Sequence, residues 1–369
     1  MVQVIIVAGF LGSGKTTLVT HAAQRLQAQG LRVGVITNDQ AGDLVDTAVV
    51  NAAHVPVVEV VGGCFCCRFP DLWRAVTTLL ETVAPDVIFA EPVGSCTDLA
   101  ATLIRPLRAY HASTVTVAPL TVLVDPTREW RSAPLAAQYL HQQQLREAEL
   151  VLVSKADLLP PAQVRQVTHR WQTAAPQAPV RLLAASDGAA VDAWLAQVRT
   201  THSEALVLRD IDYAEYAAAE AALGWLNATM RVHATRPFSL AAWLPAAALQ
   251  WAQLCTQHDA WIAHVKVAVE SAAGLAKVSL MADGRPPHWD VWPGEHMVDV
   301  AHVVINARVA LPPEQLAAVF VAWQAALPAW MTAEVVHQEV FAPAPPQPTF
   351  RFDAITPTSS EESRWPNQL

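Results

Sequence analysis

The chain carries little charge for its length. Only 15% of its 369 residues are charged, against roughly 25% in an average soluble protein. Apolar residues make up 53%, which excludes a disordered chain, and the length is enough for about two domains. The net charge of -9 excludes the electrostatic, sequence-independent binding of nucleic acid or of anionic membranes that basic proteins show. We therefore expect neither nucleic acid nor a membrane as a partner.

The sequence leads us to expect neither a targeting segment nor a membrane-spanning segment. The N-terminus runs directly into the apolar segment MVQVIIVAG, with no basic region before it and no cleavage site of small residues near it. The longest charge-free stretch lies between Arg236 and Asp259, and its two prolines and three glutamines favour a packed helix over a membrane span. These features predict a cytoplasmic protein.

A disulfide framework is missing as well. The five cysteines are an odd number, and Cys64, Cys66 and Cys67 fall within four positions. Such clustering is typical of a metal-binding or redox-active site in a reducing compartment. The sequence has no second cysteine pair that would complete a structural zinc site, and it has no histidine-rich tract.

The order of apolar segments predicts an α/β fold class. Over the first ~200 residues, short apolar strands without polar alternation alternate with amphipathic helices, which favours a doubly wound, mostly parallel sheet covered on both faces. A smaller α+β domain with an antiparallel sheet follows, and the polar residues after the proline-rich APAPPQP are expected to be disordered. The predicted division is a first domain at 1–205, a connector at 206–229, a second domain at 230–341 and a tail at 342–369.

Residues Gly9–Thr17 read GFLGSGKTT, a phosphate-binding loop between an apolar strand and a helix. Glycines allow backbone N–H groups to surround phosphate oxygens, and the helix N-terminus favours negative charge. Lys15 is expected to reach the β- and γ-phosphates, and the Thr16 hydroxyl to ligate Mg²⁺. Only four of the 24 basic Lys and Arg residues are lysines, and two of these, Lys15 and Lys155, lie in nucleotide motifs. The predicted phosphate-contacting residues are Gly9, Gly12, Ser13, Gly14, Lys15, Thr16 and Thr17.

A second motif indicates which base is bound. Ser154–Asp157 reads SKAD directly after an apolar strand and is similar to the Asn-Lys-x-Asp motif with which GTPases read guanine. Asp157 can accept hydrogen bonds from N1–H and the 2-amino group of guanine, which adenine does not offer, and the stem of Lys155 can lie over the ring. The loop after the next strand contains Ala185, whose backbone N–H is a candidate donor to the guanine carbonyl.

Two further loops are candidates for switch segments. Glu91-Pro92-Val93-Gly94 follows a strand, so that Glu91 can hold Mg²⁺ through a water and Gly94 N–H can sense the γ-phosphate. Asn38 and Asp39 follow the second strand and are the candidates for the first switch. Asp39, Asp43 and Asp46 are also candidate ligands of Mg²⁺ or of a transferred metal, although a solvated acidic loop explains these three equally well.

The cysteine loop Gly62-Gly63-Cys64-Phe65-Cys66-Cys67 also follows a strand. Parallel strands place all these loops at the same edge of the sheet, where open α/β sheets bind ligands. Three thiolates suit Zn²⁺ or a similar ion and leave a fourth position for water, a carboxylate or a partner's ligand, which favours transfer over permanent storage. Redox sensing is the alternative. We interpret Cys96 as a packed thiol and Cys255 with His258 as a core pair.

The segments GFLGSGKTT, GGCFCC, EPVG and SKAD, in this order, resemble the CobW-like P-loop GTPases, which include GTP-dependent zinc metallochaperones, cobalamin-synthesis proteins and nitrile hydratase activators. The resemblance covers about residues 1–200, and Arg236-Pro237-Phe238 is similar to the opening of the family's second domain. It implies that the chain binds GTP and Mg²⁺, hydrolyses GTP slowly, and passes Zn²⁺, Co²⁺ or a related ion to a client metalloprotein, with a homodimer left open.

Carried over by position, the resemblance assigns phosphate and Mg²⁺ binding to the phosphate loop, and guanine binding to Lys155 and Asp157. It assigns switch chemistry to Asp39 and Glu91, and metal binding to the three cysteines. The chain departs from the family at Asp39, where Glu is frequent, at Gln40-Ala41-Gly42, which replaces Phe-Gly, and in lacking a His-rich loop.

The resulting hypothesis is a switch in which GTP–Mg²⁺ reorders the loop after Asp39 and the segment 91–94, and thereby the geometry of the thiolates. Catalysis would come from charge stabilisation by Lys15, Mg²⁺ and backbone donors, with Glu91 and Asp39 as candidates for orienting the water. Two alternatives stay open: a P-loop ATPase or kinase in which SKAD is accidental, and a thiol-based regulator of cofactor assembly.

Overall fold

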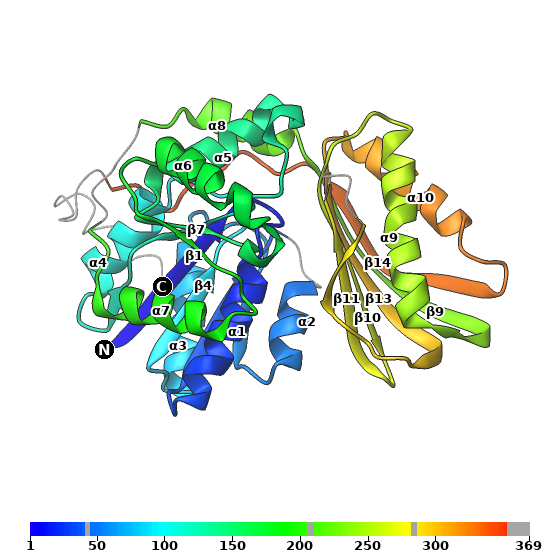
Figure 1. Ribbon diagram of the computed structural model, residues 1–369, viewed down its shortest axis with the longest axis horizontal. Helices are drawn as coiled ribbons and strands as arrows, with labels where there is room; N and C mark the ends of the chain where they lie inside the picture. The colour runs from blue at the N-terminus through cyan, green and yellow to red at the C-terminus, as the bar shows by residue number, and fades with distance from the viewer. Residues whose placement is uncertain (41–44, 205–209, 282–285, 353–369) are drawn as a thin grey trace.

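The structure is a computed structural model, and it describes residues 1–40, 45–204, 210–281 and 286–352. Two sheets lie side by side along the long axis of the molecule (Figure 1), and each has its own helices. Within these residues no helix is long and apolar enough to cross a lipid bilayer.

The first domain is built on a parallel sheet of eight strands in the order β3-β2-β4-β1-β6-β7-β8, with β5 paired to the first half of β1. Its elements are β1 (Val2–Gly9), α1 (Lys15–Ala28), β2 (Val33–Asn38), α2 (Val45–Ala52), β3 (Val57–Val60), α3 (Phe69–Thr82), β4 (Val87–Glu91), a π-helix (Ala100–Ile104), α4 (Arg105–His111), β5 (Val115–Val117), β6 (Thr121–Val124), α5 (Leu135–Glu147), β7 (Leu150–Val153), α6 (Val164–Ala174), β8 (Val180–Leu182) and α7 (Gly188–Thr200).

The strands of this sheet are buried on both faces. In β1, Val4 and Ile6 pack into one core, whereas Ile5 and Val7 pack into another on the opposite face, and all four are almost fully buried. Successive residues of a strand point to opposite faces, so a central strand covered twice needs apolar residues throughout. The predicted α/β class is confirmed, and the carboxyl ends of the parallel strands form one edge.

The second domain is an antiparallel sheet in the order β12-β11-β10-β13-β9-β14, with α9 and α10 packed on one face. The other face is turned towards the first domain (Figure 1). After the connecting helix α8 (Tyr213–Ala221), its elements are β9 (Gly224–Ser239), α9 (Leu240–Thr256), β10 (Ile262–Ser271), β11 (Gly274–Leu280), β12 (His288–Val291), β13 (Met297–Val309), α10 (Pro313–Ala325) and β14 (Met331–Phe341).

Side chains alternate between the two faces along most of the central strands of this sheet. Val265 and Val267 of β10 belong to the core under α9 and α10, while the alternate residues His264 and Lys266 lie on the opposite face. The same alternation places Lys277 of β11 and Arg308 of β13 on the face that meets the first domain. One face of the sheet is therefore a hydrophobic core and the other carries buried charge.

The second sheet begins earlier than predicted. Strand β9 starts at Gly224, inside the segment 206–229 that the sequence predicted as a connector, and Arg236-Pro237-Phe238 lies within this strand and does not open the domain. The Ala-rich composition before Gly224 hid the boundary. Helix α9 starts at Leu240, capped by Ser239, and runs through Pro245, which confirms a packed helix between Arg236 and Asp259.

The prediction of a disordered tail is wrong for residues 342–352. This segment returns to the first domain, where Phe350 and Phe352 are almost fully buried. Phe352 N–H donates to Ala101 O at 3.0 Å, and Arg351 forms an ion pair with Asp98 at 2.9 Å. Two aromatic side chains supply enough apolar burial to order a segment that is otherwise polar and proline-rich. The rest of the predicted tail, 353–369, lies outside the described residues.

Candidate functional site

The phosphate loop connects β1 to α1 and adopts the backbone that its glycines allow. Gly9, Gly12 and Gly14 all have positive φ, at 137°, 77° and 94°. At Gly9 a Cβ atom would lie 2.4 Å from Leu123 O, so this position requires glycine for space as well as for conformation. Lys15 Nζ donates to Gly9 O at 2.9 Å across the loop, and the side chain is buried. The loop thus surrounds the N-terminus of α1, as a phosphate site needs.

Thr16 and Glu91 form a polar corner beside this loop. Thr16 Oγ1 donates to Glu91 Oε1 at 2.9 Å, while Glu91 Oε2 is buried and has no hydrogen-bond partner among the described residues. Burial, reinforced by the charge of Asp46 and opposed by that of Lys15, raises the pKa of Glu91 to about 7. A hydroxyl next to a carboxylate with an unused oxygen is the donor set that Mg²⁺ prefers, so these two residues fit the metal.

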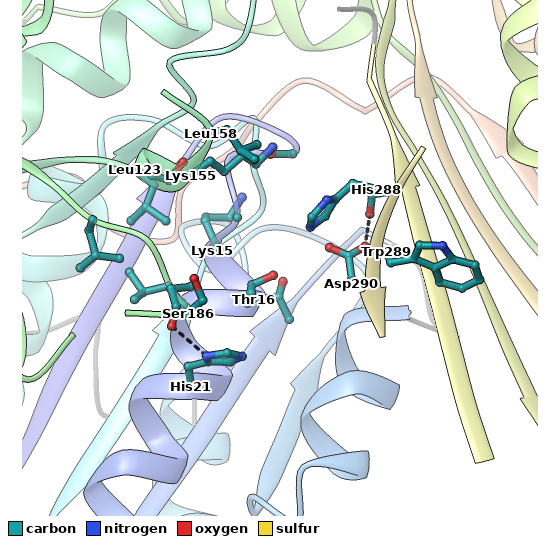
Figure 2. A pocket seen from close by; sticks show the side chains of 18 of the residues that line it. Lys15, Thr16, His21, Leu123, Lys155, Leu158, Ser186, His288, Trp289 and Asp290 are labelled. Carbon is teal, nitrogen blue, oxygen red and sulfur yellow. Dashed lines mark hydrogen bonds between the residues drawn. The ribbon is translucent and has the colours of Figure 1, made fainter. Parts of the chain in front are cut away.

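A cavity of about 300 Å³ opens over the phosphate loop (Figure 2). It reaches from Lys15 and Thr16 to Lys155, Asp157 and Ala185 on the loops that follow β7 and β8. The structure thus brings together both nucleotide motifs that the sequence separates by some 140 positions.

The SKAD loop is anchored to the phosphate loop. Lys155 has a positive φ of 50°, and its Nζ donates to Asp125 Oδ2 at 2.7 Å and to Gly12 O at 3.2 Å. Ser154 is buried, and its hydroxyl donates to Val124 O at 3.1 Å. Asp157 is exposed in the cavity wall. This arrangement leaves the Asp157 carboxylate free to approach a base, while Lys155 and Ser154 fix the loop.

The second domain forms the opposite wall of the cavity. Lys266, Lys277, Ser279, Met281, His288, Trp289 and Asp290 come from β10, β11, the segment after β11, and β12. Figure 2 shows His288 and Asp290 facing Lys15 and Thr16 across the cavity, while the ring of Trp289 between them points to the other side of the strand. At Gly12 a Cβ atom would lie 2.8 Å from Met281 Sδ, so the second domain approaches the phosphate loop closely. All four lysines of the chain line this single cavity.

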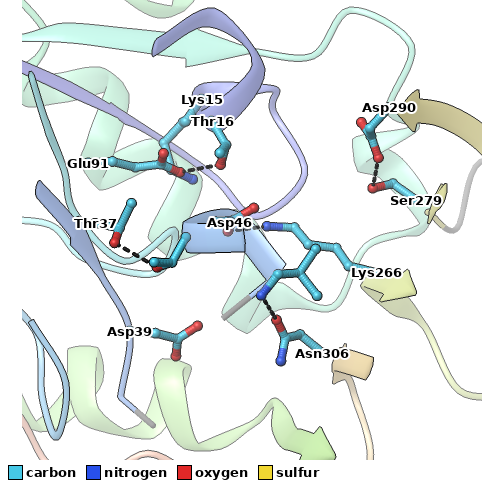
Figure 3. A network of polar contacts seen from close by, with 12 residues as sticks. Lys15, Thr16, Thr37, Asp39, Asp46, Glu91, Lys266, Ser279, Asp290 and Asn306 are labelled. Atoms are coloured by element: carbon cyan, nitrogen blue, oxygen red, sulfur yellow. Dashed lines mark hydrogen bonds and ion pairs between the residues drawn. The ribbon is translucent and has the colours of Figure 1, made fainter. Parts of the chain in front are cut away.

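The start of α2 is held by the second domain (Figure 3). Lys266 Nζ lies 2.5 Å from Asp46 Oδ2, and Asn306 Oδ1 accepts from Val45 N–H at 3.1 Å. Although burial raises the pKa of Asp46, the charges of Lys266 and Lys277 lower it far below its usual value. Arg308 of β13 donates to Asp39 Oδ2 at 2.8 Å, which joins the predicted first switch to the second sheet as well. Asp43 lies outside the described residues.

The thiols of Cys64, Cys66 and Cys67 form a compact cluster. Their sulfur atoms lie 2.7 Å (64–66), 3.2 Å (64–67) and 3.8 Å (66–67) apart. The 66–67 separation equals the ~3.8 Å between two thiolates on one tetrahedral zinc ion, and the other two are shorter, so Cys64 would have to move outwards to share an ion with them. Hydrogen bonds from the thiols of Cys66 and Cys67 lower the pKa of Cys64, so one thiolate is stabilised within the cluster. The predicted metal ligands are therefore within reach of one ion.

Asn38 connects the cysteine loop to the switch segment. Its Nδ2 donates to Val60 O at 3.0 Å and to Gly63 O at 2.8 Å, and its Oδ1 accepts from Phe65 N–H at 2.9 Å. The next residue along the chain is Asp39, which binds the second domain. Cysteine loop and nucleotide cavity thus share one rim of the sheet.

Two more features lie beside the thiols. Cys96 is buried in the same core as Cys64 and Cys66, in agreement with the packed thiol that we expected, and the neighbouring Cys64 raises its pKa. The C-terminal segment passes over the loop, where Gln347 N–H donates to Cys67 Sγ at 3.2 Å. Thr349 N–H donates to Cys66 O at 2.9 Å.

Several functional candidates were missed from the sequence. Lys266, Lys277, Asn306 and Arg308 lie on the inner face of the second sheet, and the only signal was a charged or amide residue between apolar ones, as in HVKVAV. Cys255 packs in the core of the second domain, as expected, and His258 is exposed.

Residues 3–181 match the CobW/HypB/UreG nucleotide-binding domain. The zinc chaperone YeiR of Escherichia coli is 25% identical over 179 residues, covering 47% of this chain and 52% of YeiR. The zinc chaperone CobW of a Sinorhizobium species is 30% identical over 194 residues, covering 42% of this chain and 51% of CobW. The chain thus spans about half the length of these relatives.

Among solved structures, HypB from Helicobacter pylori in complex with nickel has a TM-score of 0.41 at 19% identity, covering 56% of this chain and 92% of that one. The Zn(II)-bound YjiA GTPase from E. coli has a TM-score of 0.38 at 15% identity, covering 87% of this chain and 98% of that one. Residues 3–181 of this chain are a nucleotide-binding domain of the CobW/HypB/UreG family.

Proposed function

We propose that this chain is a GTP-binding and GTP-hydrolysing metallochaperone. It carries Zn²⁺, or a related divalent ion such as Co²⁺, on Cys64, Cys66 and Cys67 and transfers it to a client metalloprotein in the cytoplasm. The names of two relatives, both zinc chaperones, support the cargo, and the compact thiol cluster supports the site. The net charge of -9 agrees with a protein client and not with nucleic acid.

The observation that carries this proposal is the position of Asn38. Its side chain makes three hydrogen bonds to the backbone of β3 and the cysteine loop, and it lies between the Cys64 loop and the switch segment that starts at Asp39. A shift of the switch segment on nucleotide binding therefore changes the backbone that positions the thiols. This is the physical coupling that an energy-driven transfer of an ion requires.

Roles within the nucleotide site follow from the contacts. Lys15 and the N–H groups of the loop from Gly9 to Thr17 bind phosphate, and Thr16 with Glu91 would hold Mg²⁺, which when bound neutralises charge developing on the phosphates. Gly94 is packed against the backbone of Leu11 and can sense the γ-phosphate side. Because Arg308 engages Asp39, we assign to Asp39 the positioning of the switch segment.

The decisive experiment measures Zn²⁺ affinity of the purified chain by competition with a chelator, in the presence of Mg²⁺ with either GDP or a non-hydrolysable GTP analogue. We expect the two affinities to differ by about tenfold or more, since a useful coupling free energy is about 1–3 kcal/mol. Equal affinities would refute the coupling. Cys66→Ser tests the site, because the variant is expected to lose the high-affinity ion while still binding nucleotide.

Guanine is favoured over adenine by Asp157, which is exposed in the cavity wall next to the anchored Lys155. Competition of GTP and ATP for the site decides between the GTPase and an ATPase or kinase. Asp157→Asn is expected to reduce GTP affinity at least tenfold, because it removes the negative charge and replaces one of the two acceptor oxygens with an NH2 donor that would face a guanine N–H group. Preferential binding of ATP by the unaltered chain would overturn the guanine assignment.

A further inference from the structure

We propose that Lys266, on the second domain, is a ligand of the terminal phosphate of the bound nucleotide, and that this contact makes the second domain a sensor of the triphosphate. The inference rests on the proposed nucleotide binding and deepens it. In the structure Lys266 is instead paired with Asp46 at the start of α2. Binding of the triphosphate would replace this carboxylate with a phosphate oxygen.

The first support is the convergence of cations on one cavity. The same cavity is lined by Lys15 of the phosphate loop and by Lys266 and Lys277 of the second sheet. Burial lowers the pKa of Lys15, and the positive charge of Lys266 also lowers it. Lys277 is 3% exposed, and the Lys266 side chain 14%. Burying ammonium groups of like charge side by side is costly unless anions compensate them. A triphosphate with its Mg²⁺ is an anion of suitable charge and size for this cavity.

The second support is the position of the Lys266 ammonium group, which lies between the first domain and the second domain. Lys266 borders both the main cavity and a small adjoining cavity formed by Lys15, Asp46, Glu91 and Gly94. This adjoining cavity lies between the phosphate loop and both candidate switch segments. Lys266 reaches this adjoining cavity from the second domain and Lys15 reaches it from the start of α1, next to Gly94, to which we assigned the γ-phosphate side.

The third support is that the exchange leaves no buried charge without a partner. Lys277 Nζ already lies 3.5 Å from Asp46 Oδ1 and 3.8 Å from Asp290 Oδ2. When Lys266 turns to phosphate, Asp46 keeps an ion pair with Lys277, and so the cost of leaving a buried carboxylate unpaired does not arise. The movement frees the start of α2 from one of its contacts with the second sheet, so the switch segment responds to the third phosphate.

The test compares dissociation constants for GDP and for a non-hydrolysable GTP analogue, both with Mg²⁺, using the full chain. Lys266→Met is expected to raise the dissociation constant of the analogue about 10- to 100-fold and that of GDP less than about threefold. This is the effect of losing one charge-assisted hydrogen bond to the terminal phosphate. Arg231→Met is the control, because Arg231 is an exposed cation on the same face of the same sheet, outside the cavity.

The single variant leaves Asp46 with one partner fewer, so the double variant Lys266→Met/Asp46→Asn tests the same contact without that burial cost and is expected to show the same selective loss. Asp46→Asn alone is expected to improve binding of the analogue relative to GDP, because Lys266 then gives up no ion pair when it binds the phosphate. Equal losses for both nucleotides, or no loss, would overturn the role of Lys266 while leaving the nucleotide site intact. If the unaltered chain binds neither nucleotide, it is the proposed function that fails.

Discussion

Arg308 of β13 and Asp39 at the end of β2 form an ion pair at 2.8 Å that joins the two domains, 269 positions apart in sequence. Arg308 is 1% exposed, lies over the ring of Trp225 at 4.0 Å, and donates to Asn227 Oδ1 at 2.8 Å. Asn227 is fully buried beside this guanidinium, and the Asp39 side chain is 14% exposed. The pair joins the end of β2 to the second sheet.

Arg308→Met is predicted to destabilise the chain by about 3 kcal/mol, because it leaves the Asp39 carboxylate without its cation and Asn227 Oδ1 with Asn306 Nδ2 as its remaining side-chain donor. Urea unfolding followed by circular dichroism measures the change. The double variant Arg308→Met/Asp39→Asn is expected to regain part of the loss, since no charge is then left unpaired. If the stability loss of the double variant equals the sum of the losses of the two single variants, the two side chains are not energetically coupled.

Asn38→Ala is predicted to uncouple metal from nucleotide. Without the amide, the cysteine loop loses two hydrogen bonds, and β3 loses one, to the residue that precedes Asp39. We expect the ratio of Zn²⁺ affinities with GTP analogue and with GDP to approach one. Asn51→Ala, an exposed asparagine on α2, is the matched control and should leave the ratio unchanged. An unchanged ratio in Asn38→Ala would mean that coupling takes another route.

Phe352→Ala is predicted to loosen the C-terminal segment over the thiols. The side chain is 2% exposed, and the segment that it anchors places Gln347 N–H on Cys67 Sγ. Loss of its packing should raise the rate at which a thiol reagent modifies Cys67 by about tenfold or more, because local opening becomes easier. The double variant Phe352→Ala/Cys67→Ser is the control, because the accelerated modification should disappear when Cys67 is removed. If the rate does not change, the segment does not protect the thiol.

Glu91 is predicted to make stability depend on pH. Burial raises its pKa to about 7 in the folded chain, above the usual 4.5, so folding favours the protonated form. Its contribution is therefore largest below about pH 4.5 and is lost as pH rises through 7. Between pH 5.5 and 8 the loss is on the order of 2 kcal/mol, from about 1.4 kcal/mol per pKa unit.

Urea unfolding at both pH values, compared between the unaltered chain and Glu91→Gln, isolates this contribution from those of other acids. The difference in stability between the two proteins should shift with pH in the direction given above. In parallel, Mg²⁺-dependent nucleotide binding of the unaltered chain should strengthen from pH 6 to 8, as the carboxylate that would hold Mg²⁺ forms. A difference that is the same at both pH values would show that Glu91 is already ionised at pH 5.5.

The motifs that the sequence revealed are contiguous, which is why they could be recognised without a structure. The loop from Gly9 to Thr17, the cysteine loop and SKAD each depend on the backbone of a few neighbouring residues. Parallel strands then bring all three to one edge, because each strand in such a sheet ends on the same side. The sheet order and the three sulfur distances agree with that expectation.

Contacts between distant parts of the chain had no such signal. The amino-acid sequence determined the parallel sheet, the phosphate loop and the thiol cluster, because local spacing and apolar periodicity specify them. Only tertiary packing decided that the second sheet turns Lys266 and Arg308 onto the switch segment and that Gln347 crosses Cys67. These contacts span 220 to 280 positions, and they arise from how two hydrophobic cores dock, which no local pattern encodes.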